Sequence, residues 1–562
     1  MRWTLKPKPE AVKVKLLQKV LQIDEVVAVL LLQRGIETYE AAKTFFRPSL
    51  SDLHDPFLMK DMDIAVSRIE AAIENNENIL VFGDYDVDGT SSVALMSSYL
   101  KTRTDNVATY IPDRYDEGYG VSIMGIDFAN DNDFSVIIAL DCGVKAIDKV
   151  AYAKEKGIDF IICDHHRPGN ELPQAIAVLD PKRDDCEYPY KELCGCGVGF
   201  KLIQALASKE GKTAEDLTEY LDLVATAIGA DIVPITGENR ALAYFGLQVI
   251  NSSPRPGIKA IINQVKKDEL TITDVVFIVA PRINAAGRMK HGNYAVTLLT
   301  ETNFELAEEY AAEIEVFNTD RRDADQQITV EALEQIETQN EQERFTTVVY
   351  HETWHKGVIG IVASRLIETY YRPTLVFTKS GDRLAASARS VSGFDVYNAL
   401  EACAEHIEQF GGHKYAAGLT LKEENYEAFK EAFEKEVSKT IDKSILTPEI
   451  KVDFKIDLNQ VNNKLWRIIK QFAPFGPGNM TPIFMTENLN DTGYGKCVGE
   501  DDKHLRITVT QTAADKIVCI GFGLGDRLSL IKDKKPFKAV YSIDENHWQG
   551  RTSLQLKLRD IK

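Results

Sequence analysis

Long hydrophobic runs are absent from this sequence. No stretch of roughly 18 or more consecutive apolar residues occurs, which is the length that a membrane-spanning helix needs. The first residues, MRWTLKPKPEAVKVK, carry lysines but no apolar segment followed by a small-residue cleavage site, so no secretory signal is predicted. We therefore expect a cytoplasmic protein without membrane attachment.

Paired cysteine motifs are also absent. Eight cysteines are scattered along the chain, and the five that lie between residues 142 and 196 form no pair of Cys-x-x-Cys knuckles. Cys194 and Cys196 could hold a metal ion together, but their spacing is so short that buried, reduced thiols are the expected state. A structural zinc site of the usual kind is not predicted.

A surplus of positive charge is missing. The 562 residues include 66 Lys and Arg against 85 Asp and Glu, which gives a formal net charge of -19. Phosphate binding normally draws on surplus basic residues, so this balance lowers the expectation of a nucleic-acid partner. It does not exclude one, because charge is local and bound divalent cations reverse the sign of an acidic site.

Glycine and proline are absent between Gly292 and Gly357, where an acidic, helical pattern predicts a long connecting helix or a helix pair. Before this span, from about residue 78 to 182, apolar runs without polar alternation are separated by amphipathic stretches, which is typical of a parallel sheet covered on both faces. After it, a second α/β pattern runs from FTTVVYHE to GGHKYAAGLTL, and short strands with turns fill the rest.

The length and these patterns predict several domains. The predicted parts are an N-terminal segment (1–50), an α/β domain with a parallel sheet (51–292), a helical connector (293–343), a second α/β domain (344–445) and an all-β barrel (446–562). No internal repeat and no low-complexity segment interrupts them.

Three aspartates follow the first predicted strand, Asp84, Asp86 and Asp88 in GDYDVDG. Carboxylates spaced two residues apart repel one another unless a cation lies among them, so the segment indicates part of a metal site. An acidic turn is the alternative, because Asp and Gly are common turn residues.

Other polar residues fall where parallel strands end, at the sheet edge that usually binds ligands. Asp141 ends SVIIALD, His165 follows FIIC, and Asp231 follows a mostly apolar helical run. Oxygen ligands suit Mg²⁺, and the added His shifts the preference toward Mn²⁺, with Zn²⁺ excluded only by availability. Together with Asp86 and Asp88 these ligands exceed the needs of one Mg²⁺, so we expect two ions that share a carboxylate. Taken singly, Asp141 could be a helix cap and His165 a core residue.

The segments GDYDVDG, SVIIALDCG, FIICDHH and ADIVP together resemble the DHH phosphoesterase superfamily. With PRINAAGRM, SARS and GGHKYAAG, the chain from about residue 50 onward is similar to the bacterial single-strand-specific exodeoxyribonucleases of that superfamily. The resemblance implies two ions, Mn²⁺ or Mg²⁺, and His166 beside the attacking water or the scissile phosphate. Asp84 matches less directly and is expected to support the site. The implied metal ligands are Asp86, Asp88, Asp141, His165 and Asp231.

The resemblance also implies an architecture and a substrate path. The second α/β domain is expected to be the DHH-associated domain, joined to the first by a long helix, with a glycine-rich turn at His413 that approaches phosphates. The barrel is expected to be an OB fold, with Trp548, Arg551 and Lys557 as candidates for holding single strands; ordinary barrel surface is the alternative.

Further substrate contacts are implied at Arg282, Asn284 and Arg288, for which a structural arginine pair is the alternative. Ser387 and Arg389, with Arg114, are expected to grip a 5′-phosphate through charge-assisted hydrogen bonds. The alternative is that Arg389 only pairs with a neighbouring carboxylate.

The implied activity is 5′ to 3′ exonucleolytic release of 5′-mononucleotides from single-stranded DNA, in DNA repair and recombination. Single-stranded DNA is the expected partner, with a helicase and a single-strand-binding protein as further ones, and we expect a monomer. Two alternatives stay open. One is a DHH hydrolase of short oligoribonucleotides or cyclic dinucleotides, against which the barrel argues. The other is a non-catalytic scaffold, against which the filled ligand positions argue.

Overall fold

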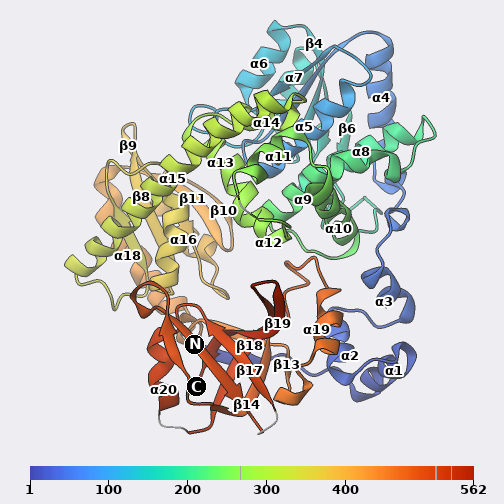
Figure 1. Cartoon of the computed structure of the whole chain (residues 1–562). Helices are drawn as coiled ribbons and strands as arrows, with labels where there is room; N and C mark the ends of the chain where they lie inside the picture. The colour runs from blue at the N-terminus through green and yellow to red at the C-terminus, as the bar shows by residue number, and fades with distance from the viewer. Residues whose placement is uncertain (266, 513–514, 533–534) are drawn as a thin grey trace. The chain divides into compact units, whose positions relative to one another are not determined.

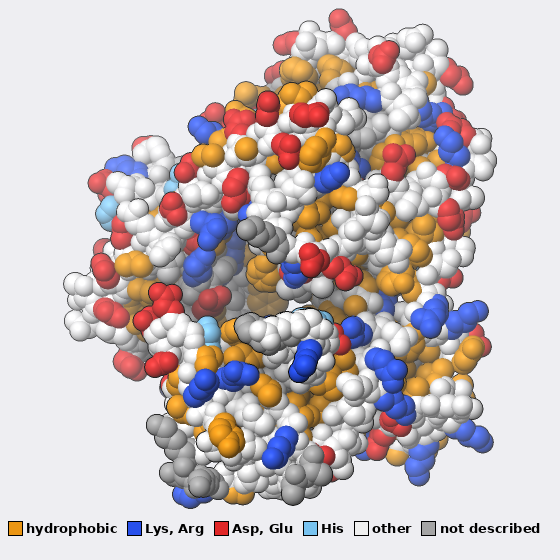
Figure 2. All heavy atoms as spheres, in the orientation of Figure 1, with side chains coloured by type: hydrophobic (Ala, Val, Ile, Leu, Met, Phe, Trp, Pro, Cys, Tyr) orange, Lys and Arg blue, Asp and Glu red, His pale blue; other side chains and the backbone are white. Residues whose placement is uncertain are grey.

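The computed structural model describes residues 1–265, 267–512, 515–532 and 535–562, and the side chains of Lys532 and Trp548 lie outside what it describes. The chain forms two compact units, one made of Met1–Thr4 with Glu315–Ile450 and the other of Leu5–Ile314 with Lys451–Lys562 (Figure 1). Figure 2 shows Asp and Glu side chains on the visible surfaces of both units. No helix in the described part of the chain is long and apolar enough to cross a membrane.

A parallel five-stranded sheet is the centre of the larger unit. Its strand order is β3-β2-β4-β5-β6, with bounds β2 (Asn78–Gly83), β3 (Val107–Tyr110), β4 (Phe134–Leu140), β5 (Asp159–Cys163) and β6 (Ala177–Leu179). The strands are apolar on both faces because helices cover both. α6 (Ile123–Asp131) and α7 (Ile147–Glu155) pack on the face of Leu80, Phe82 and Ile137. The opposite side is covered by α4 (Met62–Glu74), α5 (Val87–Leu100) and α8 (Gly195–Ser208).

Further helices complete this domain. They are α9 (Leu221–Ala230), α10 (Gly237–Ser252), α11 (Pro256–Asn263), α12 (Ile272–Asp274), α13 (Ala280–Met289) and α14 (Asn293–Thr300), with a π-helical turn at Val275–Val279. The segment PRINAAGRM forms most of α13, and its proline closely follows the π-helical turn. The expected connecting helix is α15 (Phe304–Thr338), a single helix of 35 residues.

The smaller unit contains a mixed sheet of order β10-β11-β9-β8-β7, in which only β7 and β8 run parallel. Its strands are β7 (Thr347–Tyr350), β8 (Thr374–Ser380), β9 (Arg383–Arg389), β10 (Gln409–His413) and β11 (Ala416–Leu421). Its helices, besides the later part of α15, are α16 (Ile359–Thr369), α17 (Val396–Glu401) and α18 (Tyr426–Thr440). Phe429 and Phe433 of α18 are fully buried against this sheet.

The C-terminal strands close into a barrel of order β13-β14-β18-β19-β17-β16-β15, with β14 also pairing with β16. They are β13 (Phe454–Lys455), β14 (Phe484–Asp491), β15 (Lys496–Val498), β16 (His504–Thr510), β17 (Lys516–Gly521), β18 (Phe537–Trp548) and β19 (Arg551–Ile561). Two short helices belong to this part of the chain, α19 (Asn463–Lys470) and α20 (Leu528–Lys532).

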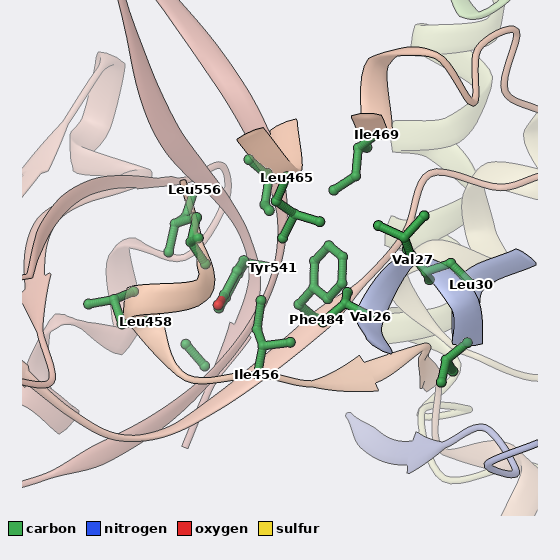
Figure 3. Close-up of a cluster of buried hydrophobic side chains, with 14 of the residues drawn as sticks. Val26, Val27, Leu30, Ile456, Leu458, Leu465, Ile469, Phe484, Tyr541 and Leu556 are labelled. Atoms are coloured by element: carbon green, nitrogen blue, oxygen red, sulfur yellow. The ribbon is translucent and has the colours of Figure 1, made fainter. Parts of the chain in front are cut away.

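The N-terminal helices share the core of the barrel (Figure 3). They are α1 (Ala11–Leu21), α2 (Glu25–Leu32) and α3 (Tyr39–Phe46), and strand β1 (Arg2–Leu5) pairs with β12 (Glu449–Val452). The run VVAVLLL makes α2 apolar on all sides, which requires burial on all sides. One cluster therefore unites Val27 and Leu30 of α2 with Phe484 and Tyr541 of the barrel.

A buried arginine ties these parts to the parallel-sheet domain. Arg240 of α10 donates hydrogen bonds to the carbonyl oxygen of Phe45 at 3.0 Å and to four successive carbonyl oxygens, those of residues 471–474, at 2.8 to 3.3 Å. Its guanidinium also lies 3.9 Å from the ring centre of Phe45. These contacts compensate the guanidinium for its lost hydration.

Candidate active site

The turn between β2 and α5 carries the three aspartates, and two glycines make it tight. A Cβ on Gly89 would lie 2.4 Å from the carbonyl oxygen of Asp84, and one on Gly83 would lie 2.9 Å from the carbonyl oxygen of Gly89. Asp86 caps α5, since its Oδ1 accepts a hydrogen bond from the backbone N–H of Gly89 at 3.0 Å. The glycines thus hold carboxylates at the end of a buried strand.

Asp88 lies in the first turn of α5 and faces the first turn of a second helix. Its two carboxylate oxygens accept hydrogen bonds from the backbone N–H groups of Gly195 and Cys196 of α8, both at 2.7 Å. A Cβ on Gly195 would lie 2.6 Å from the Cβ of Asp141, so glycine is needed for this approach. Burial raises the thiol pKa values of Cys194 and Cys196, which therefore remain protonated.

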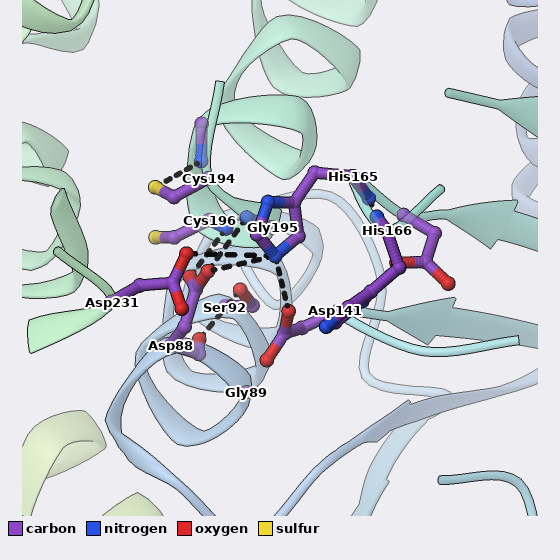
Figure 4. Close-up of polar contacts among 12 residues, drawn as sticks. Asp88, Gly89, Ser92, Asp141, His165, His166, Cys194, Gly195, Cys196 and Asp231 are labelled. Carbon is purple, nitrogen blue, oxygen red and sulfur yellow. Dashed lines mark hydrogen bonds and ion pairs between the residues drawn. The ribbon is translucent and has the colours of Figure 1, made fainter. Parts of the chain in front are cut away.

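His165 lies among three of the other predicted ligands, Asp88, Asp141 and Asp231 (Figure 4). Its Nε2 lies 3.1 Å from Oδ1 of Asp141, 3.6 Å from Oδ2 of Asp231 and 3.8 Å from Oδ2 of Asp88. Burial lowers the pKa of His165 to about 3, so the ring is neutral and offers a lone pair.

The carboxylates around His165 are crowded in a dry environment. Burial, with repulsion by Asp86, raises the pKa of Asp84 to about 8 and that of Asp88 to about 7. Burial and the charge of Asp88 raise the pKa of Asp231 to about 8, and Asp141 is raised well above its usual value for the same reasons. Divalent cations would relieve this repulsion, so the donor set fits the metal ions predicted from the sequence.

His166 lies next to this cluster in the opposite protonation state. Its Nδ1 is 2.8 Å from Oδ1 of Asp164, and its Nε2 is 3.2 Å from the hydroxyl of Tyr119. Burial opposes charge on His166, but the hydrogen bond with Asp164 raises its pKa to about 9. Burial likewise opposes ionisation of Asp164, yet the hydrogen bond from His166 holds its pKa at about 2. The pair is therefore an imidazolium and a carboxylate at neutral pH.

Comparison with known proteins decides the family. A model described as the DHH family, N-terminal domain, matches residues 78–228, a DHHA1 domain model matches residues 342–439, and a RecJ OB domain model matches residues 452–560. The curated single-stranded-DNA-specific exonuclease RecJ of Bacillus subtilis (strain 168) is 37% identical over 567 residues, which cover 100% of this chain and 70% of that protein. The chain belongs to the RecJ family.

Other members of the RecJ family agree with this assignment. The RecJ exonuclease of Salmonella typhimurium (strain LT2) is 33% identical over 527 residues, which cover 90% of each chain. The solved structure of RecJ from Thermus thermophilus in complex with Mn²⁺ matches with a TM-score of 0.86 and 25% identity, over 100% of this chain and 79% of that chain. The predicted superfamily and fold class are confirmed.

Two of the segments that the family resemblance connects with substrate binding, those of Arg114 and of α13, lie beside the aspartates in the larger unit. A Cβ on Gly287 of α13 would lie 2.5 Å from the carbonyl oxygen of Tyr85, which brings the helix of Arg282, Asn284 and Arg288 against the acidic turn. The guanidinium of Arg114 lies 4.1 Å from the ring centre of Tyr85. Positive side chains therefore border the carboxylate cluster.

Ser387 and Arg389 lie side by side at the end of β9 in the smaller unit. Arg389 Nη1 donates hydrogen bonds to Oγ of Ser387 at 3.0 Å and to the carbonyl oxygen of Ala388 at 2.8 Å. A Cβ on Gly360, in the first turn of α16, would lie 3.0 Å from Nη2 of Arg389. Among the described residues no carboxylate lies within ion-pair distance of Arg389, so the carboxylate-pairing alternative finds no support in the structure.

The glycine-rich segment at His413 forms a β-hairpin, and the predicted turn lies at Lys414 and Tyr415. Gly411, Gly412 and His413 lie in strand β10 directly before this turn and pair in register with Gly418, Ala417 and Ala416 of β11. Gly412 has a φ of 143°, and a Cβ there would lie 2.4 Å from the carbonyl oxygen of Ala416. The glycines therefore serve a close approach of two strands, next to the strand that carries Arg389.

The structure describes the side chains of two of the three candidate residues of the barrel, Arg551 and Lys557. Arg551 is exposed, and Nζ of Lys557 lies 5.6 Å from the ring centre of the exposed Phe522. The side chain of Trp548 lies outside the described residues. Phe522 offers an aromatic surface that sequence reasoning did not select.

Two further residues of the site, Tyr119 and Asp164, received no role from the sequence. Tyr119 contacts His166, and its position depends on Gly118 and Gly120, whose φ angles are +83° and +78°. The pattern EGYG was a usable signal, because glycines on both sides of an aromatic residue permit a turn that other residues avoid. Asp164 was visible beside the histidines, but its role depends on hydrogen bonds that spacing alone does not reveal.

We predict that Asp164→Asn lowers the pKa of His166 from about 9 toward its ordinary value of 6.5 in metal-free protein. The raised pKa of His166 stabilises the folded protein. This contribution to the free energy of unfolding is complete below about pH 6.5 and is lost as the pH rises through about 9. The lowered pKa of Asp164 contributes stability above about 3.8, which is lost as the pH falls through about 2. The destabilisation by Asp164→Asn is therefore expected to be larger at pH 5 than at pH 9.

The measurement is NMR titration of the His166 ring, combined with urea unfolding at both pH values. Asp148→Asn, which changes an aspartate in the first turn of α7, serves as the control and should leave the His166 titration unchanged. An unaltered His166 pKa in Asp164→Asn would contradict the assignment.

Proposed function

We propose that the protein is a single-stranded-DNA-specific 5′ to 3′ exonuclease that releases 5′-mononucleotides by phosphodiester hydrolysis with two divalent cations, Mn²⁺ or Mg²⁺. The observation that carries the proposal is the approach of Nε2 of His165 to three carboxylates from three different segments, at 3.1, 3.6 and 3.8 Å. Membership of the RecJ family, whose curated relatives are named as exonucleases of this specificity, supports the choice of substrate.

In this proposal Asp86, Asp88, Asp141, His165 and Asp231 hold the cations, and Asp84 lies behind them. Two cations held there would stabilise the attacking and the leaving oxygens of the phosphodiester. His166, kept as an imidazolium by Asp164, donates a hydrogen bond to a phosphate oxygen when substrate displaces its contact with Tyr119. Arg282, Asn284 and Arg288 contact the substrate. Ser387 and Arg389, with Arg114, bind its 5′-phosphate, and the glycine-rich segment at His413 approaches its phosphates.

The two alternative functions are less well supported. A hydrolase of short oligoribonucleotides or cyclic dinucleotides would not need the barrel, which shares its core with the N-terminal helices. A non-catalytic scaffold would not need neutral His165 among carboxylates whose pKa values are raised by crowding. We place the exonuclease in the cytoplasm, in DNA repair and recombination, as a monomer to which a helicase and a single-strand-binding protein deliver single strands.

The test is digestion of one long oligonucleotide, labelled at either end, as a single strand and as a blunt duplex, with Mn²⁺, Mg²⁺ or chelator. We expect a labelled mononucleotide to appear first from the 5′-labelled single strand, only with metal. Mononucleotides appearing first from the 3′-labelled strand would contradict the direction, and equal digestion of the duplex would contradict the specificity.

Metal binding itself is expected to release protons. At pH 7 the carboxyl groups of Asp84 and Asp231, with pKa values of about 8, are largely protonated in metal-free protein, and that of Asp88, with a pKa of about 7, is about half protonated. Binding requires the deprotonated forms, so saturation with Mn²⁺ should release roughly two protons and raise the thermal midpoint. Titration in weakly buffered solution measures the protons, and Asp231→Asn should release about one fewer. No proton release would contradict the metal assignment.

A further inference from the structure

Helix α1 is apolar on two sides. Val14 and Leu17 are buried in the core that the N-terminal helices share with the barrel. On the other side Val12, Leu16 and Val20 are 76%, 58% and 47% exposed. Residues spaced by four lie one above the other on a helix, so these three side chains form one continuous stripe, which we call the α1 stripe.

The α1 stripe is unusual for an outward helix face. Single exposed apolar residues are normal on protein surfaces, but the outer face of a surface helix is usually polar or charged. Here three successive turns present branched apolar side chains, while charged residues occupy the flanks. Continuous exposed apolar surface of this kind is typical of a contact site.

The flanks of the α1 stripe are positive. Residues 1–20 contain six Lys and Arg residues and one acidic residue, Glu10, in a chain whose net charge is -19. Lys13 forms an ion pair with Glu37 at 2.9 Å, whereas for Lys15 and Lys19 no carboxylate of the described residues lies within ion-pair distance. Helical spacing places both of these lysines along one side of the stripe. The lower right of Figure 2, where Figure 1 shows α1 to α3, carries Lys and Arg side chains beside hydrophobic ones.

We propose that the α1 stripe is a docking site for an acidic, amphipathic helix of a partner protein. The apolar side chains of the partner helix would cover Val12, Leu16 and Val20, and the carboxylates of the partner helix would pair with Lys15 and Lys19. Nucleic acid fits less well, because phosphates gain nothing from three aliphatic side chains. A lipid surface also fits less well, because the stripe is short and the opposite face of α1 is committed to the core. The interface is small, so binding is weak and transient.

The experiment measures binding and needs no nuclease readout, so its outcome does not depend on the proposed function. The probe is a fluorescent synthetic helix of about 18 residues, five turns, with leucines on one face and glutamates elsewhere. A second helix with lysines in place of the glutamates is the charge control. Fluorescence anisotropy with the full-length protein is expected to show saturable, salt-sensitive binding of the acidic helix alone.

Matched variants locate the site. Leu16→Ser and the pair Lys15→Glu with Lys19→Glu are each expected to weaken binding about tenfold. Leu306→Ser, at an exposed leucine of α15, and Lys435→Glu with Lys439→Glu, an exposed pair with the same spacing on α18, should change binding less than about twofold. Unchanged thermal midpoints confirm that all variants are folded.

Three results would overturn the proposal. The first is equal binding of the acidic helix to the α1 variants and to the control variants. The second is the absence of saturable binding to the unmutated protein. The third is loss, in the α1 variants alone, of binding to anionic phospholipid vesicles or to an oligonucleotide that displaces the helix, because the stripe would then serve a different class of partner.

Discussion

Asp141→Asn is expected to reduce the rate of hydrolysis by at least about 10²-fold while leaving the fold intact. Asp141 is buried, its Oδ1 lies 3.1 Å from Nε2 of His165, and it belongs with His165 and His166 to one group that could hold a metal ion. An amide has the same shape but not the charge that a shared ligand supplies. Asparagine also suits the backbone better than alanine, because residue 141 has a φ of 60°.

The same substitution is expected to keep or raise the thermal midpoint of metal-free protein, since it removes one carboxyl from a crowded, dry cluster. Asp180→Asn is the matched control. Asp180 is fully buried at the end of β6, burial raises its pKa to about 7, and we assign it no ligand role. We expect that variant to keep most of its activity. Near-normal turnover of folded Asp141→Asn would refute the two-metal site.

Arg389→Ala is expected to abolish most of the preference for 5′-phosphorylated over 5′-hydroxyl single strands. The guanidinium lies against Oγ of Ser387 and the first turn of α16, where a hydroxyl, an arginine fork and helix N–H groups can surround a phosphate. Burial lowers the pKa of Arg389, and no carboxylate of the described residues neutralises it. A charge-assisted contact contributes roughly 1.5 to 3 kcal/mol, which corresponds to a preference on the order of tenfold to a hundredfold.

The measurement compares initial rates on the two kinds of 5′ end. Arg383→Ala is the control, because Arg383 lies at the other end of the same strand and pairs with Glu408. That variant should retain the preference, and both variants should retain metal-induced proton release. Equal rates on the two ends with unmutated protein would disprove the pocket, whatever the variants do.

The strand ends, and the ligands that follow them, were predictable because each strand is visible as a local apolar run in the sequence. The buried runs before Asp84, Asp141 and His165 predicted parallel strands, and parallel strands end at one edge of a sheet. The structure places Asp88, Asp141, His165 and Asp231 together, as predicted. Contact of these four side chains and of Asp86 with metal, and the supporting role of Asp84, stay predictions.

Features that depend on distant packing were not predictable. Asp88 accepts hydrogen bonds from residues more than a hundred positions away, Gly195 and Cys196, and no local pattern indicates such a pairing. The apolar run of α2 predicted burial, while its partner, the barrel, follows only from the tertiary fold.

The core shared by α1 to α3 and the barrel limits how this chain can be shortened. Deleting either end would expose apolar side chains of the other, because residues 14–45 and 456–561 form one cluster. Deleting the barrel would also leave the buried Arg240 without four of its carbonyl acceptors. The N-terminal helices and the C-terminal barrel must therefore be inherited together. A gene that encodes one without the other would yield a chain prone to aggregation rather than a smaller nuclease.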